Sequence, residues 1–158
     1  MDDLSLNLDD WMRLALQEAE KALRKGEVPV GAIIVLDDQI IGRGHNQTEQ
    51  LKDPTAHAEI LAITSACQVI GDWRLDNAVM FCTLEPCSMC AGAAVLARIK
   101  KIVYGASDPK FGGCGSIFTI PSDPRLNHRV ELVGGVLAEE AAAMMQAFFR
   151  EIREDRIN

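Results

Sequence analysis

Two cysteines stand three positions apart directly after an apolar run, and this arrangement constrains the fold most strongly. The run AVMFCTL (78–84) predicts a buried strand, because it is almost entirely apolar and short. The following segment, EPCSMCAGAAVLARI (85–99), predicts a helix that starts at Pro86, where proline fits the first turn. Cys87 and Cys90 are therefore expected on one face of a helix at its N-terminus, so that their two sulfurs can meet one ion.

A second polar motif stands at the start of another predicted helix. Pro54 opens a helix expected over roughly 55–70, and His57 and Glu59 fall in its first turn. A helix N-terminus favours thiolate over thiol, and thiolate is the form that binds zinc. Two cysteines and His57 make three ligands, and a site with three protein ligands leaves one position for water. The sequence thus predicts a catalytic zinc site rather than a structural one.

Glu59 has a place in this chemistry. Zinc lowers the pKa of a bound water to about 7, and the released proton then needs a carrier. Two residues from His57, Glu59 is expected to collect that proton and deliver it to a leaving group. Thiolates with imidazole favour zinc, with iron as the alternative metal.

Each of these residues also has a plainer interpretation. The cysteine pair suits a redox motif or a buried thiol pair, His57 a helix cap, and Glu59 a first-turn carboxylate. Cys67 and Cys82 lie in apolar stretches and are expected to be core thiols. A fourth ligand would make the metal site structural, and the spare candidates for it are Cys114, His45 and His128.

The rest of the chain alternates between helix and strand patterns. Helices are expected over about 8–25, 55–70, 85–99 and 137–155, and strands over 28–36, 39–46, 78–84, 100–106 and 129–135. A polar loop is expected over 48–55, and residues 107–128 are expected to be mostly loop with a short helix. This alternation predicts an α/β fold: a three-layer α/β/α sandwich around a mixed sheet of about five strands, in one domain over 1–158.

Composition excludes several classes of protein. The 158 residues are 48% hydrophobic and 25% charged, which is typical of a globular domain rather than a disordered or fibrous chain. No apolar run approaches the roughly 20 residues of a membrane span. The start, MDDLSLNLDD, has four Asp and no Lys or Arg, so a cytoplasmic location without a targeting signal is expected. Five cysteines, an odd number, argue against a disulfide framework.

The net charge of −7 alone argues against a nucleic-acid partner. Its distribution is uneven, however: residues 1–97 hold 7 basic and 15 acidic side chains, and residues 98–158 hold 9 and 8. A local basic surface, if present, is therefore expected to come mainly from the second half.

The order His-x-Glu followed by Pro-Cys-x-x-Cys resembles the zinc-deaminase signature. Five further segments point to a narrower family among the zinc deaminases. They are VPVGA (28–32), DPTAHAEI (53–60), TLEPCSMCAGA (83–93), LNHRVE (126–131) and the FFR end (148–150) of the last predicted helix. On these segments the chain resembles the bacterial tRNA-specific adenosine deaminases over nearly its whole length. These belong to the cytidine-deaminase superfamily.

This resemblance implies hydrolytic deamination of adenosine to inosine at the wobble position of a tRNA anticodon. It implies one zinc ion per subunit on His57, Cys87 and Cys90, with Glu59 as proton shuttle. It also implies a homodimer whose active site borrows residues from the neighbouring subunit, and neither a membrane nor DNA as partner.

The resemblance further assigns substrate contacts. Asn46 would hydrogen-bond the flipped base, Asp108 and Lys110 would line the anticodon groove, and Phe149, Arg150 and Arg153 would contact flanking nucleotides. The Phe and Arg residues suit single-stranded RNA, which is bound by stacking and by cations. Phe148 is expected to pack on the core instead.

The chain departs from the family pattern in two places. Gln47-Thr48-Glu49-Gln50 follows Asn46, where a basic residue is common, and Phe111 stands where a small or polar residue is more usual. A deaminase of free guanine, cytosine or cytidine with the same zinc site is the alternative function, and a non-enzymatic zinc or RNA-binding module is a third.

Overall fold

A mixed sheet organises the chain. Within residues 7–157, the part described by this computed structural model, five strands pair in the order β2-β1-β3-β4-β5. The strands are β1 (Gly31–Leu36), β2 (Gln39–His45), β3 (Val79–Leu84), β4 (Lys101–Ala106) and β5 (Glu131–Val133). β1 is antiparallel to both β2 and β3, whereas β3, β4 and β5 are parallel to one another. The predicted mixed sheet is thus confirmed.

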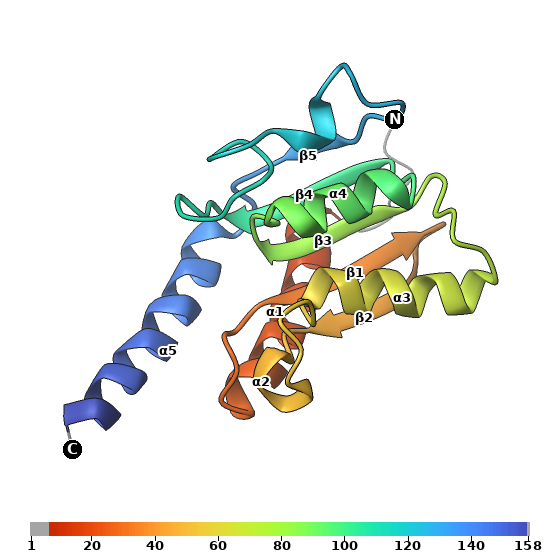
Figure 1. Cartoon of the computed structure of the whole chain (residues 1–158). Helices are drawn as coiled ribbons and strands as arrows, with labels where there is room; N and C mark the ends of the chain where they lie inside the picture. Colours follow the sequence, from red (N-terminus) through yellow and green to blue (C-terminus); the bar gives the residue numbers. More distant parts are fainter. Residues whose placement is uncertain (1–6, 158) are drawn as a thin grey trace.

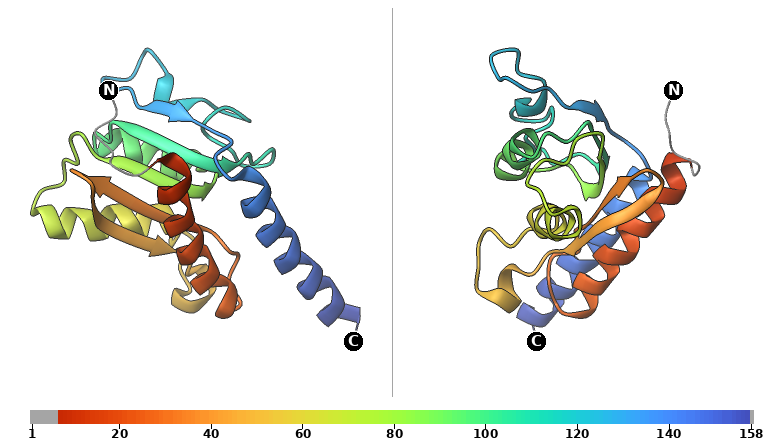
Figure 2. Two further views of the ribbon diagram at one scale, coloured as in Figure 1. Left: turned by 180° about the vertical axis from the view of Figure 1, so that it is seen from behind. Right: turned by 90° about the vertical axis from the view of Figure 1, so that its right-hand side faces the viewer.

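Helices cover both faces of this sheet, as the right-hand view of Figure 2 shows. α1 (Leu8–Arg24) and the start of α5 (Ala138–Ile157) lie on one face, and α3 (Ala58–Ile70) and α4 (Ser88–Leu96) lie on the other. The remaining elements are the short helix α2 (Thr48–Leu51) and the 3-10 helix η1 (Ile120–Ser122). α5 continues past the sheet and ends away from it (Figure 1). The predicted three-layer sandwich is confirmed.

Side-chain alternation along the strands explains the two layers of core. Successive strand residues point to opposite faces, so a strand that is apolar throughout can serve both. In β1, Ala32 and Ile34 join the core under α3 and α4, whereas Ile33 and Val35 join the core under α1. The near-continuous apolar runs in the sequence therefore reflect strands that are buried on both sides.

Two helices start later than the prolines before them suggest. Pro54 and Pro86 were expected inside first turns, but α3 begins at Ala58 and α4 at Ser88. Asp53 accepts hydrogen bonds from the backbone N–H (2.8 Å) and the hydroxyl (2.7 Å) of Thr55, and this local turn replaces the first helical turn.

The consequence concerns the two ligand candidates that precede these helices. The sequence suggested that His57 and Cys87 lie inside the first turns of these helices. In the structure they are the N-cap residues that precede the first turns. A third difference is α2, a short helix inside the predicted polar loop.

Helix α3 lies unusually close to strand β2. A Cβ atom on Gly44 would lie 2.2 Å from the carbonyl oxygen of Ala58, and one on Gly42 would lie 2.3 Å from that of Ala62. Only glycine permits this approach. The two glycines therefore set the depth at which the first turn of α3, with Glu59, sits on the sheet. No helix in the described part of the chain is long and apolar enough to span a membrane.

Candidate active site

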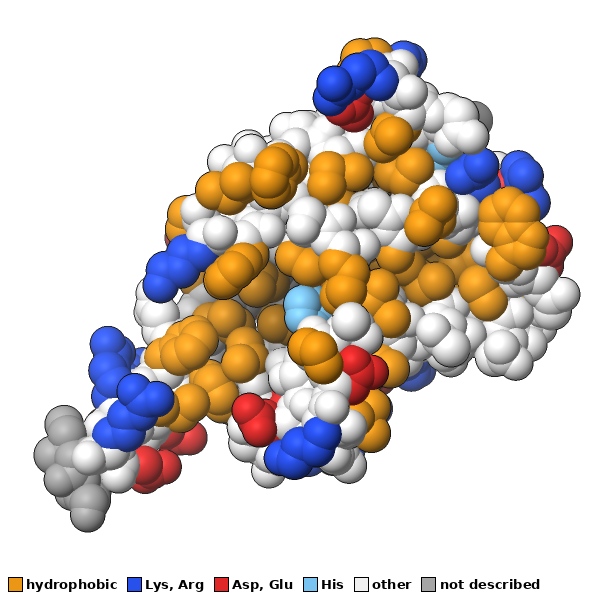
Figure 3. Space-filling model, in the orientation of Figure 1, with side chains coloured by type: hydrophobic (Ala, Val, Ile, Leu, Met, Phe, Trp, Pro, Cys, Tyr) orange, Lys and Arg blue, Asp and Glu red, His pale blue; other side chains and the backbone are white. Residues whose placement is uncertain are grey.

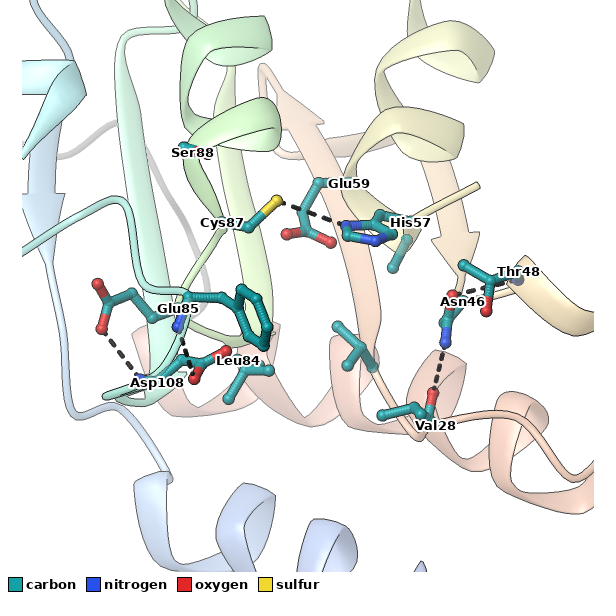
Figure 4. A pocket seen from close by; sticks show the side chains of 13 residues that line it. Val28, Asn46, Thr48, His57, Glu59, Leu84, Glu85, Cys87, Ser88 and Asp108 are labelled. Atoms are coloured by element: carbon teal, nitrogen blue, oxygen red, sulfur yellow. Dashed lines mark hydrogen bonds between the residues drawn. The ribbon is translucent and has the colours of Figure 1, made fainter. Parts of the chain in front are cut away.

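The N-termini of α3 and α4 bring three possible metal ligands together. The Nδ1 atom of His57 lies 3.5 Å from the Sγ atom of Cys87 and 3.6 Å from the Sγ atom of Cys90. All three ligand atoms lie within 4.8 Å of one another, and within residues 7–157 no other such group of His, Cys, Asp or Glu occurs. Cys87 and His57 point toward each other in Figure 4. The structure thus joins two motifs that are 30 positions apart.

These distances suit a tetrahedral metal ion. With metal–sulfur bonds of about 2.3 Å and metal–nitrogen bonds of about 2.0 Å, the sulfur–nitrogen edges of a tetrahedron are about 3.5 Å long. The two distances from His57 match that edge. Two thiolates and an imidazole are also donors that zinc prefers. The residues present therefore fit zinc without rearrangement.

The environment favours ionisation of Cys87 and opposes ionisation of Cys90. Hydrogen bonding with Cys90, and then with His57, lowers the pKa of the Cys87 thiol to about 4. The hydrogen bond to Cys87 and burial raise the pKa of Cys90, so its proton stays in place until a cation displaces it. The hydrogen bond with Cys87 raises the pKa of His57. The pKa values of the three groups are therefore coupled through the contacts between them.

Glu59 lies beside this group in the first turn of α3. Figure 4 shows its carboxylate next to the His57 ring and near the Cys87 sulfur. The residue is 4% exposed, and burial raises the pKa of its carboxyl above the usual range. A carboxyl with a raised pKa is suited to taking up and releasing a proton.

His57, Glu59 and Cys87 line a pocket of about 420 Å³. Its wall comes from five separate segments of the chain, which are the turn before β1, the end of β2, the N-termini of α3 and α4, and the loop after β4. The lining residues are Val28, Val30, Asn46, Thr48, His57, Ala58, Glu59, Leu84, Glu85, Cys87, Ser88, Asp108 and Phe111. A cavity of this size is that of a typical small-ligand site.

Asn46 is buried in the pocket wall and is held at both ends of its amide. Its Nδ2 atom donates to the carbonyl of Val28 at 3.3 Å, and its Oδ1 atom accepts from the backbone N–H of Thr48 at 3.3 Å (Figure 4). A side-chain amide has two donors and two acceptor sites. One donor and one acceptor site therefore remain for another group in the pocket.

Glu85, which the sequence did not single out, organises the loop after β4. Its buried carboxylate accepts the backbone N–H groups of Asp108 (3.0 Å), Cys114 (3.0 Å) and Ser116 (3.1 Å), and also the Ser116 hydroxyl. Burial alone would raise the pKa of this carboxyl, but the hydrogen bonds outweigh burial and lower it. A Cβ on Gly112 would lie 2.2 Å from Glu85, so the loop closes on the carboxylate only with glycine there.

A second unpredicted carboxylate, Glu27, holds the opposite wall. It is 1% exposed and accepts the backbone N–H groups of Glu49 (3.0 Å) and Gln50 (2.8 Å) at the start of α2. The only sequence signal for either residue is a carboxylate directly beside an apolar strand.

The other predicted contact residues are spread over the surface. Asp108 lines the pocket, whereas Lys110 is exposed on the same loop outside its lining. On α5, exposed Phe149, Arg150 and Arg153 lie outside the pocket lining as well. Figure 3 shows Lys and Arg side chains along α5 and hydrophobic side chains over the face beside it. Phe148 is buried, as predicted.

The spare cysteines and histidines stay outside the metal group. Cys82 is a buried core thiol, as predicted, whereas Cys67 is only half-buried. Cys114 is buried without joining the group, and burial raises the pKa of its thiol to about 12. The Nε2 atom of His128 lies 2.8 Å from the carbonyl oxygen of Ile99.

Comparison with known proteins gives consistent results. Residues 6–153 match the MafB19-like deaminase family. The chain is 49% identical over 146 residues to the tRNA-specific adenosine deaminase of Bacillus subtilis, covering 92% of this chain and 91% of that protein. It is 48% identical over 147 residues to that of Aquifex aeolicus, covering 93% and 97%.

Solved structures agree. A tRNA:A34 deaminase superposes with a TM-score of 0.82 at 44% identity, covering 85% of this chain and 98% of that one. A guanine deaminase from Nitrosomonas europaea superposes with a TM-score of 0.80 at 20% identity, covering 92% and 86%, which shows a shared fold. The chain therefore belongs to the family of tRNA-specific adenosine deaminases.

Proposed function

We propose that this protein hydrolyses adenosine to inosine at the wobble position of a tRNA anticodon. The observation that carries the proposal is the buried Glu59 beside the group of His57, Cys87 and Cys90 in a pocket. The chain is about half identical to named tRNA-specific adenosine deaminases, and its described fold resembles a tRNA:A34 deaminase. A base must leave its stack to reach such a pocket.

The metal in this proposal is zinc, bound by His57, Cys87 and Cys90. When bound, zinc would lower the pKa of a water molecule, so that hydroxide is available at neutral pH. Glu59 would take up the proton that the attacking water loses and pass it to the departing amine, so that oxygen replaces nitrogen on the purine and ammonia leaves. Its raised pKa supports both uptake and release.

The remaining residues of the proposal bind the substrate. The free donor and acceptor of Asn46 suit the edge of a flipped base. Asp108 and Lys110 line the path of the anticodon loop, and Phe149, Arg150 and Arg153 contact flanking nucleotides by stacking and charge. The exposure of Lys110 and of the three α5 residues supports contact with a polymer rather than with a small enclosed molecule.

The proposal includes a homodimer in the cytoplasm, where tRNA is available. Large hydrophobic side chains are exposed at the C-terminal ends of α3 and α4, namely Val69, Ile70 and Leu96. Exposed apolar side chains on neighbouring elements are typical of protein contacts. Sedimentation of the wild type and of Leu96→Glu tests this part: the wild type is expected to sediment as a dimer and the variant as a monomer.

The deciding experiment measures inosine formation by zinc-loaded protein. The substrates are an anticodon stem-loop with a wobble adenosine, free adenosine, cytidine and guanine. We expect inosine in the stem-loop alone, and a loss of about 10²- to 10⁴-fold in kcat for Glu59→Gln with zinc still bound. Turnover of only a free base or nucleoside would overturn the tRNA assignment. Full activity of His57→Ala would overturn the enzymatic one.

A further inference from the structure

An aromatic side chain stands exposed at the edge of the pocket. Phe111 is one of the residues that line it, yet 70% of its surface is accessible to solvent. Glu59, at the other extreme of the same lining, is 4% exposed. Phe111 therefore lies at the mouth of the pocket and Glu59 at its inner end.

The backbone that carries Phe111 is firmly held. The N–H of Phe111 donates to the Asp108 carboxylate at 3.2 Å, and the N–H of Gly112 donates to the Asp108 carbonyl at 2.9 Å. Gly112 also forms an isolated β-bridge with Cys87, which ties this point of the loop to the N-cap of α4. The ring is thus exposed on a fixed support, which reduces the entropy that a stacking contact would cost.

The position of the ring indicates what it meets. A nucleotide in an RNA strand that enters the pocket is still joined to its two neighbours, so these neighbours must lie across the pocket mouth. Every base has a flat face that an aromatic ring can stack on, and exposed cations beside the ring add attraction for the backbone. Lys110, the residue before Phe111, is such an exposed cation.

We propose that Phe111 is a stacking platform for the base next to the adenosine that enters the pocket. This inference rests on the proposed function and adds a substrate contact to it. Phe111 acts on binding of the polymer and takes no part in the proton transfers at Glu59.

The test is steady-state kinetics on the wobble-adenosine stem-loop. Phe111→Ala is expected to raise KM by about ten- to a hundredfold with kcat unchanged within about twofold, since stacking on a base is lost. Phe111→Tyr is expected to keep the wild-type KM, and Phe111→Leu to behave like Phe111→Ala. Phe118→Ala is the matched control, because Phe118 is 55% exposed on the same loop outside the pocket lining.

A second arm uses stem-loops that lack the base on the 5′ or the 3′ side of the adenosine. On one of these two substrates the KM of the wild type is expected to rise to that of Phe111→Ala, and the variant is expected to lose nothing further. Independent losses on both substrates would overturn the inference. So would an unchanged KM for Phe111→Ala, an equal loss in Phe118→Ala, or a wild-type KM for Phe111→Leu.

The two proposals fail differently. If the wild type forms no inosine in the stem-loop, the proposed function is wrong, and the stacking role, which rests on it, is wrong as well. If the wild type is active and the Phe111 variants match it, only the stacking role fails.

Discussion

The buried carboxylate of Glu27 accepts the backbone N–H of Gln50 at 2.8 Å. This contact joins the turn before β1 to the segment after β2, two parts of the chain that both line the pocket. Val28, the next residue, accepts the side-chain amide of Asn46. Glu27 therefore fixes the wall in which Asn46 stands.

Glu27→Gln is expected to lower the free energy of unfolding by about 1–3 kcal/mol, because the new NH₂ group faces a buried N–H donor that loses its acceptor. KM for the stem-loop should rise with it. Urea unfolding measures the first effect and kinetics the second. Glu20→Gln is the control, since Glu20 is exposed and pairs only with Arg24 among the described residues. Equal stability of the two variants would contradict the role of Glu27.

Glu85→Gln should destabilise the protein more than Ser116→Ala. Glu85→Gln weakens the hydrogen bonds from Asp108, Cys114 and Ser116 at the same time. Ser116→Ala removes only the hydrogen bond from the Ser116 hydroxyl to Glu85. Loss of one hydrogen bond to a charged group is worth about 1.5–3 kcal/mol. Hydrogen exchange of the amide protons of Cys114 and Ser116 should speed up in Glu85→Gln. Slow exchange there would show that another contact holds the loop.

Gly44→Ala is expected to cost about 1–3 kcal/mol of stability and to weaken metal binding, since the added methyl group overlaps the Ala58 carbonyl and displaces the start of α3. The control is Gly92→Ala in α4, where a Cβ meets nothing within 4 Å. Alanine there should stabilise the helix by about 0.5–1 kcal/mol. Calorimetric unfolding and zinc titration distinguish the two variants, and similar behaviour would refute the close-packing argument.

The stability of the protein should fall as pH drops below neutrality, in part through His45. The pKa of His45 lies below 6.5, mainly because the ring is partly buried and because the positive charge of Lys25 is near. Lys21 also lowers this pKa, whereas the carboxylates of Glu18 and Glu27 raise it without cancelling the other effects. At pH values between the pKa of His45 in the folded protein and 6.5, the unfolded chain binds more protons than the folded protein does. The free energy of unfolding therefore decreases as the pH falls through that window. His45→Gln should flatten this dependence in urea unfolding at a series of pH values. An unchanged slope would assign it to other groups.

Removal of the metal should lower the midpoint of thermal unfolding. An ion that binds only the folded chain stabilises it by about 4 kcal/mol at a thousandfold excess over its Kd. Chelation should therefore lower Tm, and added zinc should restore it. Cys90→Ser should lose this response, whereas Cys67→Ser should keep it because Cys67 lies outside the group. A zinc response in Cys90→Ser equal to that of the wild type would contradict the assignment of Cys90 as a ligand.

Local patterns explain what the sequence could predict. Apolar runs such as 78–84 predicted strands, because a strand buried on both faces has no polar alternation. The grouping of His57 with Cys87 and Cys90 was predictable from two local signals. Both motifs stand at the start of a predicted helix, and their side chains are of the types that bind zinc. The roles of Asn46, Asp108, Lys110, Phe149, Arg150 and Arg153 in substrate binding stay predictions.

Long-range contacts explain what the sequence could not predict. Glu27 and Glu85 bind backbone groups that lie 22 to 31 positions away, and a backbone N–H leaves no mark in a sequence. Glu27 accepts N–H groups at the start of α2, so this distant residue helps to hold the helix within the predicted loop. The later start of α3 follows from the turn at Asp53, which competes with the proline signal.

The strand order β2-β1-β3-β4-β5 has a consequence for the growing chain on the ribosome. After the β1–β2 hairpin, each strand that emerges adds to the edge left by an earlier one, so none has to be inserted between two paired strands. All three candidate ligands have been synthesised by Cys90, before β4, β5 and α5. The three candidate ligands are therefore all made before α5, whose residues take no part in the metal group.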